Sequence, residues 1–258
     1  MRDENKNCLT FYGGFPLYIC NMEVKSRAIV LGSIKYGDKG AVLKLYTEAH
    51  GLQSYMIHSL YGKKGIVKPS HVLPLTLLEG VFSYRGKGTL ERVKEIRVIH
   101  QNADLSTDPV LVSVAFFVRE VLQNVLREED SDSDLFEFLV QLLLSLDVDA
   151  PSLTWFPHQF LLDLSQFLGF YPDPQAFRTG WYFDQIEGGF CDRPPLHGHC
   201  LYPEASAVLC ELIRGMVPTG VSKRTRHEVL EGLIDFYRVH YAGFRELNSL
   251  EVLREILS

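Results

Sequence analysis

Three short stretches in the first third of the sequence each combine one tyrosine with two basic residues. They are Lys35-Tyr36 with Lys39, Tyr61 with Lys63-Lys64, and Tyr84-Arg85 with Lys87. This combination suits a single nucleic-acid strand held without regard to sequence, because cations neutralise phosphates while aromatic rings stack on bases. The alternative for any single lysine is an ordinary solvated charge. Three such stretches together favour a strand-binding surface.

Glycines accompany the three stretches and predict that they lie in loops. In the segment 61–70 (YGKKGIVKPS), Gly62 and Gly65 would let the backbone adapt to a phosphate chain. Further cations in the predicted DNA-binding set are Arg27, Lys44 and Lys68. Tyr46 and Tyr55 fall inside expected strands, so we predict that they pack rather than stack on bases.

The charge of the chain is unevenly distributed. Residues 22–100 contain thirteen Lys and Arg against six Asp and Glu, a net charge of +7. The whole chain carries −6 and the first 21 residues are neutral, so residues 101–258 carry −13. Such asymmetry predicts two domains with different partners, one of them a polyanion. The alternative is that the basic and acidic halves simply attract each other.

Short runs with a period of two supply the elements that would position the loops. Strands are expected at 24–34, 40–47, 51–58, 72–84 and 90–99. Along 40–47, Ala41, Leu43 and Leu45 alternate with Val42, Lys44 and Tyr46. Five short strands in about eighty residues predict a small closed barrel of the oligonucleotide-binding type, the OB-fold.

Beyond residue 100 the period changes to that of helices. Thr107-Asp108-Pro109 is a helix start, with a capping side chain before proline. Further helices are expected at 135–146, 151–168, 203–214, 223–242 and 249–257, and the one at 151–168 is expected to bury Phe156, Phe160, Leu161, Leu164, Phe167 and Leu168. An irregular insert at about 170–202 would pair 181–184 with 190–192. The predicted fold class is α+β, with the barrel at 22–100 and an α-helical domain at 101–258.

The first 21 residues contain neither a cationic start with an apolar core nor a lipoprotein cleavage site. We interpret them as a tail or a non-native extension, with Met22 as the working start. No apolar run approaches the 18 or so residues of a membrane span. Five irregularly spaced cysteines, Cys8, Cys20, Cys191, Cys200 and Cys210, are expected to be reduced thiols of a cytoplasmic protein.

Several motifs of the N-terminal part resemble the barrel of the RecO family of bacterial recombination mediators. They are the Arg-Ala-x-Val-Leu core at Arg27–Leu31, the polar loop at Ser33–Gly40, Tyr46-Thr47-Glu48 followed by Gly51, and the basic glycine loop Tyr61–Gly65. Arg119–Leu122 and Phe167–Phe170 match the helical part more loosely. The resemblance runs in order through residues 22–258.

The resemblance implies a cytoplasmic, nucleoid-associated protein that is not an enzyme. It implies binding of single- and double-stranded DNA, annealing of complementary strands, and contact with the C-terminal tail of single-strand-binding protein. Together with RecR, such a protein loads RecA. Some relatives hold zinc with two Cys-x-x-Cys pairs in the insert, but this chain has none, and His197, His199 and Cys200 are too crowded to join Cys191 in one tetrahedral site. We therefore expect no cofactor and a metal-free insert packed on its aromatic residues.

Lys223-Arg224-Thr225-Arg226 is a dense basic cluster at a helix start in the acidic half. Cations are mildly disfavoured there by the helix dipole, so Lys223, Arg224 and Arg226 are the predicted contacts for an anionic partner. The alternative is pairing within the chain to acids such as Glu228 and Glu231.

Two other classes of function compete with strand binding. An enzyme would have to use His158 with Asp163, or Cys191 with His197 and His199, but no catalytic motif accompanies them. A protein-only adaptor would instead bind a polypeptide on the barrel. Salt separates it from the first hypothesis, because phosphate contacts weaken steeply as salt rises.

Overall fold

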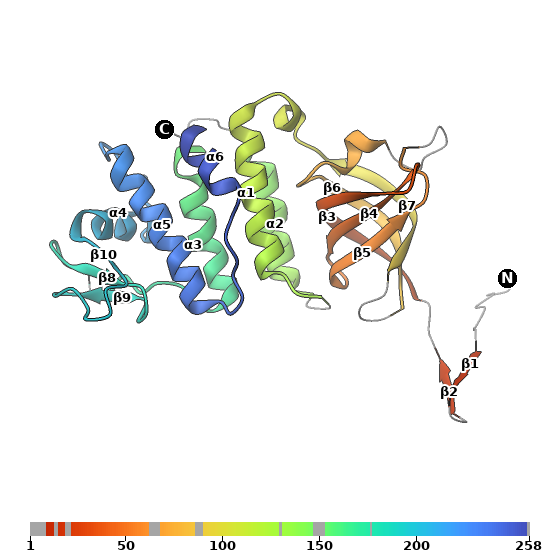
Figure 1. The fold of residues 1–258 in the computed structure, drawn as a ribbon, viewed down its shortest axis with the longest axis horizontal. Helices are drawn as coiled ribbons and strands as arrows, with labels where there is room; N and C mark the ends of the chain where they lie inside the picture. The colour runs from red at the N-terminus through yellow and green to blue at the C-terminus, as the bar shows by residue number, and fades with distance from the viewer. Residues whose placement is uncertain are drawn as a thin grey trace. The chain divides into compact units, whose positions relative to one another are not determined.

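The computed structural model describes residues 9–12, 15–18, 22–61, 68–85, 90–128, 131–146, 153–175 and 177–256. The chain divides into two compact units, Met1–Asn102 with Leu126–Asp147, and Ala103–Val125 with Val148–Ser258 (Figure 1). The sequence had assigned every residue after 100 to the helical domain. The structure instead places the helix within 126–147 in the barrel unit.

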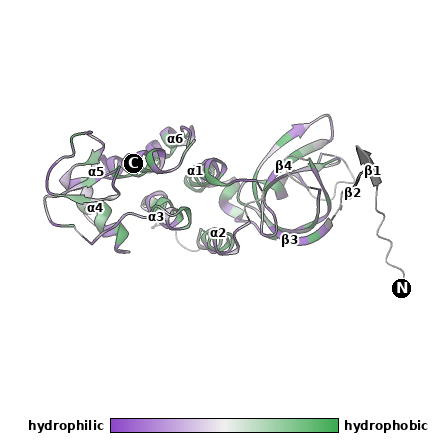
Figure 2. Cartoon of the chain, turned by 90° about the horizontal axis from the view of Figure 1, so that it is seen from below, coloured by the Kyte–Doolittle hydropathy of each residue, from purple (hydrophilic) through white to green (hydrophobic). Residues whose placement is uncertain are grey.

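Five strands form a closed barrel in the order β3-β4-β5-β7-β6. Their bounds are β3 (Met22–Tyr36), β4 (Gly40–Thr47), β5 (Gly51–Ile57), β6 (Leu77–Tyr84) and β7 (Glu91–His100). Neighbouring strands are antiparallel except β5 and β7, which run parallel. The closed ring of strands is visible in Figure 2. The predicted five-stranded OB-type barrel is confirmed.

Alternate residues of the strands fill the barrel. Ala41, Leu43 and Leu45 are fully buried, as the alternation predicted. Tyr55 is also fully buried, and its ring centroid lies 4.9 Å from that of Phe82. The prediction that Tyr55 packs rather than presents its ring is therefore confirmed.

One predicted strand begins later than expected. Residues 69–72 form a 3-10 helix, η1 (Pro69–Val72), and β6 starts only at Leu77. The cause is a turn between them: Leu75 has a φ of +63°, its backbone N–H donates to the carbonyl of Val30, and that of Thr76 donates to Leu73. A left-handed residue cannot continue an extended strand.

The helix α2 (Ser133–Ser145) belongs to the barrel unit. Asp132 caps it by accepting from the backbone N–H groups of Asp134 and Leu135. On its barrel side, the ring of Phe136 lies 5.9 Å from the ring of Tyr46. Tyr46 occupies the outward face of β4, as the alternation predicted, but the helix buries it.

Arg27 connects β3, the β4–β5 turn and α2. Its guanidinium donates two hydrogen bonds to Glu48, at 2.9 and 2.8 Å, and a third to Glu137 at 2.9 Å. The same group lies 5.1 Å from the centre of the Phe136 ring. The hydrogen bonds to Glu48 raise the pKa of Arg27 further and lower that of Glu48. Arg27 therefore holds α2 on the barrel.

The second unit is helical and encloses the insert. Its helices are α1 (Pro109–Val125), α3 (Phe156–Leu168), α4 (Pro203–Ile213), α5 (Lys223–His240) and α6 (Ser249–Ile256). Asp108 caps α1 by accepting from Val110, which confirms the predicted start. The third helix begins at Phe156 rather than near 151, and Phe167, expected to be buried, is 37% exposed. None of the described helices is long and apolar enough to cross a bilayer.

The insert contains a small antiparallel sheet in the order β10-β8-β9. Its strands are β8 (Tyr182–Asp184), β9 (Gly189–Cys191) and β10 (Cys200–Leu201), and the predicted pairing of the first two is confirmed. The sheet packs on α5 at Gly232, where the absence of a side chain leaves room for Leu201 of β10. A Cβ at Gly232 would lie 2.4 Å from Cδ2 of Leu201, so the close approach requires glycine.

Two four-residue strands lie within the first 21 residues. They are β1 (Leu9–Tyr12) and β2 (Phe15–Tyr18), and they pair antiparallel with Leu9 opposite Tyr18. The sequence had predicted only a tail in this segment.

We predict that Gly232→Ala destabilises the helical unit by about 1–2 kcal/mol, because overpacking outweighs the gain in helix propensity. The same change in a Leu201→Ala background should be neutral or stabilising, since the opposing side chain is gone. Urea unfolding followed by the fluorescence of Trp155 and Trp181, both in this unit, measures the two effects. Equal destabilisation in both backgrounds would contradict the proposed contact.

We predict that Arg27→Ala destabilises the barrel unit by about 1–2 kcal/mol, because charge-assisted hydrogen bonds are lost and two carboxylates remain close together. Hydrogen exchange across α2 should accelerate. The matched control is Arg97→Ala, whose partner Glu79 lies on an exposed face, and it should cost less than about 0.5 kcal/mol. Unchanged exchange in α2 would refute the role of Arg27.

Candidate nucleic-acid interface

The turn between β3 and β4 presents the first predicted group of residues. Tyr36 and Gly40 are opposite each other where the two strands end, and Gly37 has a φ of +62°, which the tight turn requires. Lys35, Tyr36 and Lys39 are all exposed, and 64% of Tyr36 is accessible. The hairpin therefore presents one ring and two cations to solvent.

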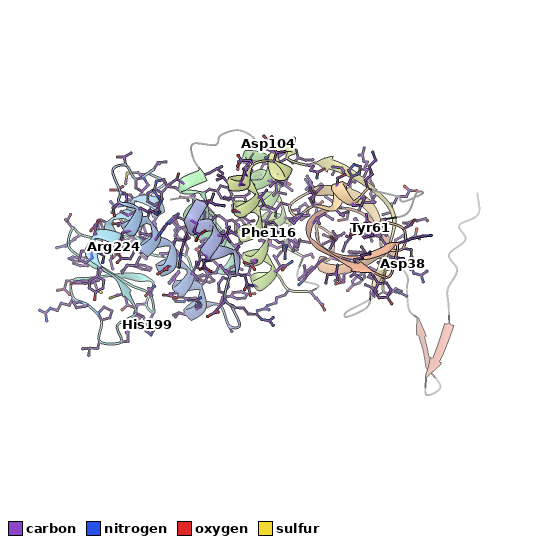
Figure 3. The ribbon with its side chains drawn as sticks, turned by 45° about the horizontal axis from the view of Figure 1, so that its top comes forward. Asp38, Tyr61, Asp104, Phe116, His199 and Arg224 are labelled. Atoms are coloured by element: carbon purple, nitrogen blue, oxygen red, sulfur yellow. The ribbon has the colours of Figure 1, made fainter. Side chains whose placement is uncertain are left out.

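From the second predicted group, Tyr61 lies next to the β3–β4 turn. Its backbone N–H donates to the carbonyl of Lys39 at 3.0 Å, and its ring centre lies 5.8 Å from Nζ of Lys35. The ring is 45% exposed. Figure 3 shows Tyr61 and Asp38, a residue of the β3–β4 turn, on the same side of the barrel. We call Lys35, Tyr36, Lys39 and Tyr61 the tip cluster.

Two more predicted cations lie outside the tip cluster. Lys44 is half-buried on β4 between Gly32 of β3 and Ser54 of β5, and Lys68 is exposed where η1 begins. In the part of the chain that the structure describes, no carboxylate lies within ion-pair distance of Lys35, Lys39, Lys44 or Lys68. Their charge is available to an external anion.

The third predicted group lies elsewhere. Tyr84 is opposite Met22, at the other end of the 15-residue strand β3 from the tip cluster. One face of its ring stacks on His50 with centroids 4.1 Å apart. Arg85 donates to the carbonyl of Leu90 at 2.8 Å and approaches the buried carboxylate of Glu91. The structure thus brings Tyr61 of the second group to the first group, whereas Tyr84 stacks on His50 and Arg85 is hydrogen-bonded near Glu91.

Lys63, Lys64 and Lys87 lie outside the described residues. Arg27 is described, but its guanidinium already donates to Glu48 and Glu137. It therefore has less to offer a phosphate than the lysines of the tip cluster.

Other cations of the barrel are neutralised by acids on adjacent strands. Glu79 of β6 lies between Lys25 of β3 and Arg97 of β7, and Lys94 pairs with Glu23 at 2.8 Å. Exposed pairs of this kind contribute little to stability, but each cancels the local field. Among the described residues, Lys35 and Lys39 are not paired in this way, so their charge is not cancelled locally.

Sequence reasoning missed Ile34, which lies next to the tip cluster, and Arg92, which lies three strands away along the same row. Ile34 is 73% exposed on β3, and the register continues from it through Val42 and Met56 to the exposed Arg92 of β7. This outer face of the second and third strands is the one that OB-folds use for ligands. Each of the four strands contributes one residue to this row, so only the pairing of the strands reveals it.

In the helical unit, Lys223 and Arg224 are exposed on the first turn of α5, and Arg226 is half-buried (Figure 3 labels Arg224). Lys223 and Arg224 line a pocket with His227, Glu228 and Glu231. The acid Glu231 pairs with Arg254 instead of with the cluster. Burial and the neighbouring Arg226 and Lys223 lower the pKa of His227. Within the described residues, neither Lys223 nor Arg224 forms an ion pair.

The groups considered for catalysis are engaged in packing. His158 is buried, its Nε2 lies 2.9 Å from the carbonyl of Arg226, and burial lowers its pKa to about 4. Asp163 accepts from Gln159, and burial raises its pKa. His158 is therefore a core residue, as its apolar helix predicted.

The insert holds its polar side chains by local hydrogen bonds. Nε2 of His197 lies 3.3 Å from Asp184, and Sγ of Cys191 donates to the carbonyl of Arg193. The described residues contain no group of three or more His, Cys, Asp or Glu arranged to hold a metal ion.

Comparison with known proteins matches nearly the whole chain. The family model for the recombination protein O N terminal matches residues 22–102, and that for the recombination protein O C terminal matches residues 106–251. Relatives named DNA repair protein RecO include that of Phocaeicola vulgatus, 33% identical over 91% of this chain and 99% of the relative. Those of Bacteroides fragilis (33%; 90% and 98%) and Flavobacterium psychrophilum (31%; 92% and 100%) are similar. The chain, with its OB-type barrel and helical unit, belongs to the RecO family.

Proposed function

We propose that this protein acts in DNA repair and recombination as a non-enzymatic mediator that binds single-stranded DNA at the tip cluster. The observation that carries the proposal is the meeting of two unpaired lysines and two exposed tyrosines where β3, β4 and the end of β5 adjoin. Membership of a family whose relatives are named DNA repair proteins supports it.

The chemistry of the tip cluster suits a strand rather than a paired duplex. Lys35 and Lys39 would neutralise phosphates and release counterions, while Tyr36 and Tyr61 would stack on unpaired bases. Ile34 adds apolar surface beside them. Duplex DNA would be held through phosphates alone, with Lys44, Lys68 and Arg92 extending the contact. Strands held with their bases exposed are ready to anneal.

The second part of the proposal concerns partners in the cytoplasm, near the nucleoid. The pocket at Lys223 and Arg224 would bind the acidic C-terminal tail of single-strand-binding protein, because two cations without ion-pair partners adjoin the N-terminus of a long helix. Arg226, half-buried, would support them. With RecR, the complex would load RecA onto coated strands.

A protein-only adaptor is the competing function, favoured by the exposed Ile34 and the half-buried Val42 beside it on the outer face of the barrel. Binding of a peptide there would depend on apolar burial and change little with salt, whereas binding of a strand weakens steeply with salt.

We predict that Lys35→Ala with Lys39→Ala weakens binding of a single-stranded oligonucleotide and slows annealing of complementary strands. Loss of two phosphate contacts should reduce the slope of log affinity against log salt by about 1.4. Fluorescence anisotropy over a salt series measures the slope, and energy transfer between labelled strands measures annealing.

The matched control is Lys25→Ala with Lys94→Ala, which removes the same charge from the ion-paired face of the barrel. It should change the slope less than the tip variant. Equal effects of both variants would place the DNA surface elsewhere, and salt-independent binding would favour the adaptor.

We predict that Tyr36→Leu with Tyr61→Leu weakens strand binding by about 1–3 kcal/mol per stacked base while leaving the salt slope unchanged. Stacking releases no counterions, so the two double variants separate the two kinds of contact. Anisotropy at fixed salt with folded variants, checked by circular dichroism, provides the comparison. Unaltered affinity would show that the rings do not contact bases.

A further inference from the structure

Several arginines of the helical unit contact either carboxylates or aromatic rings, as Arg119 does with the ring of Phe116. Arg193, Arg238 and Arg254 lie beside the carboxylates of Asp192, Asp235 and Glu231. Arg178 and Arg214 instead lie over aromatic rings, with guanidinium carbons 5.7 Å from the centre of the Trp181 ring and 5.8 Å from that of Phe177. The second group is unusual in a part of the chain with a net charge of −13.

Both of these rings belong to one short segment, so the two arginines reach the same part of the helical unit. Phe177 and Arg178 are adjacent in sequence, and the turn that follows returns the N–H of Trp181 to the carbonyl of Arg178 at 3.1 Å. The Phe177 ring is fixed against Phe190 of β9, 5.1 Å away. Arg214 reaches this segment from the C-terminal end of α4. We call Phe177, Arg178, Trp181 and Arg214 the arginine–aromatic patch.

The guanidiniums of the patch are exposed and have no carboxylate partner among the described residues. Glu211 lies three residues before Arg214, a spacing that permits an ion pair on a helix, yet Arg214 lies over Phe177 instead. Met216 and Val217, which follow Arg214, are 47% and 72% exposed. The patch thus combines unpaired cations, rings and apolar surface.

A guanidinium that lies near a ring rather than beside a carboxylate keeps its N–H donors available to another acceptor. These donors form a rigid fork that matches two oxygens of a phosphate, while a lysine at the same place would act only as a point charge. The rings and the apolar residues beside them suit unpaired bases and sugars. A phosphodiester strand therefore fits the patch better than a duplex, which offers no exposed base.

We propose that the arginine–aromatic patch is a second binding site for single-stranded nucleic acid, separate from the tip cluster. The inference rests on the proposed function, in which the barrel holds the first strand. A chain that holds two strands raises the effective concentration of each for the other, which is what annealing requires.

The test uses the full chain and two oligothymidylate strands, which cannot pair with each other. The chain is loaded on an immobilised first strand, and retention of a labelled second strand is measured. Arg178→Ala with Arg214→Ala should reduce retention at least fivefold, while affinity for the first strand, measured by anisotropy, stays within twofold of wild type. Annealing of complementary strands should slow in parallel.

Arg238→Ala with Arg245→Ala is the matched control, because it removes two exposed arginines of the same unit that do not lie over rings. This control should retain the second strand as wild type does. Equal retention by the patch variant and the control overturns the second site while leaving the barrel site standing. Displacement of the second strand by an acidic peptide, but not by free oligothymidylate, also overturns it. A wild-type chain that binds no first strand overturns the proposed function itself.

Discussion

The barrel depends on one short parallel contact between β5 and β7, where Tyr55 is opposite Glu91 and Met56 opposite Arg92. Without it, two strand edges would be left unpaired, and closure is the way such barrels remove them. Closure places Glu91 where its side chain has no exposed surface. A buried carboxylate is costly unless it is hydrogen-bonded. The backbone N–H of Arg85 and the hydroxyl of Ser83 donate to it at 2.8 and 3.1 Å, so the end of β6 is committed to closing the barrel.

Closure of the barrel also decides which of its cations have acidic partners and which do not. Strands β3, β6 and β7 bring acids and bases together: Glu79 is opposite Arg97 in the register and pairs with it and with Lys25, and Glu23 pairs with Lys94. The β3–β4 hairpin extends beyond the closed part, and no described acid of a neighbouring strand pairs with its lysines. Among the described residues, the hairpin therefore holds two lysines without a carboxylate partner, while several cations of the strands beside it are paired. Strand binding at the hairpin costs no ion pair.

The sequence predicted the barrel, most strand bounds and most helix bounds, because alternation, capping residues and glycine turns are local properties. It also predicted that two of the loops contain residues suited to binding a DNA strand. What it could not supply were contacts between distant residues. Arg27 meets Glu137 across 110 positions, and Tyr84 meets His50 through closure of the barrel. For the same reason the row from Ile34 to Arg92 was not predicted. The predicted start of β6 was too early because the turn at Leu75 depends on a hydrogen bond to the distant Val30.

The acidic charge of residues 101–258 should make the proposed second site bind DNA more weakly than the barrel does. Exposed charges act over a Debye length of about 8 Å at physiological salt, so a strand near most of that surface is repelled. Only sites where cations lack acidic partners can hold a phosphate there. Binding at such a site would be weak and reversible, in contrast to the proposed binding at the basic barrel. A mediator that gripped both strands equally would retain the duplex it forms. Strong binding at one site and weak binding at another instead lets paired strands leave, because pairing removes the exposed bases on which both sites depend.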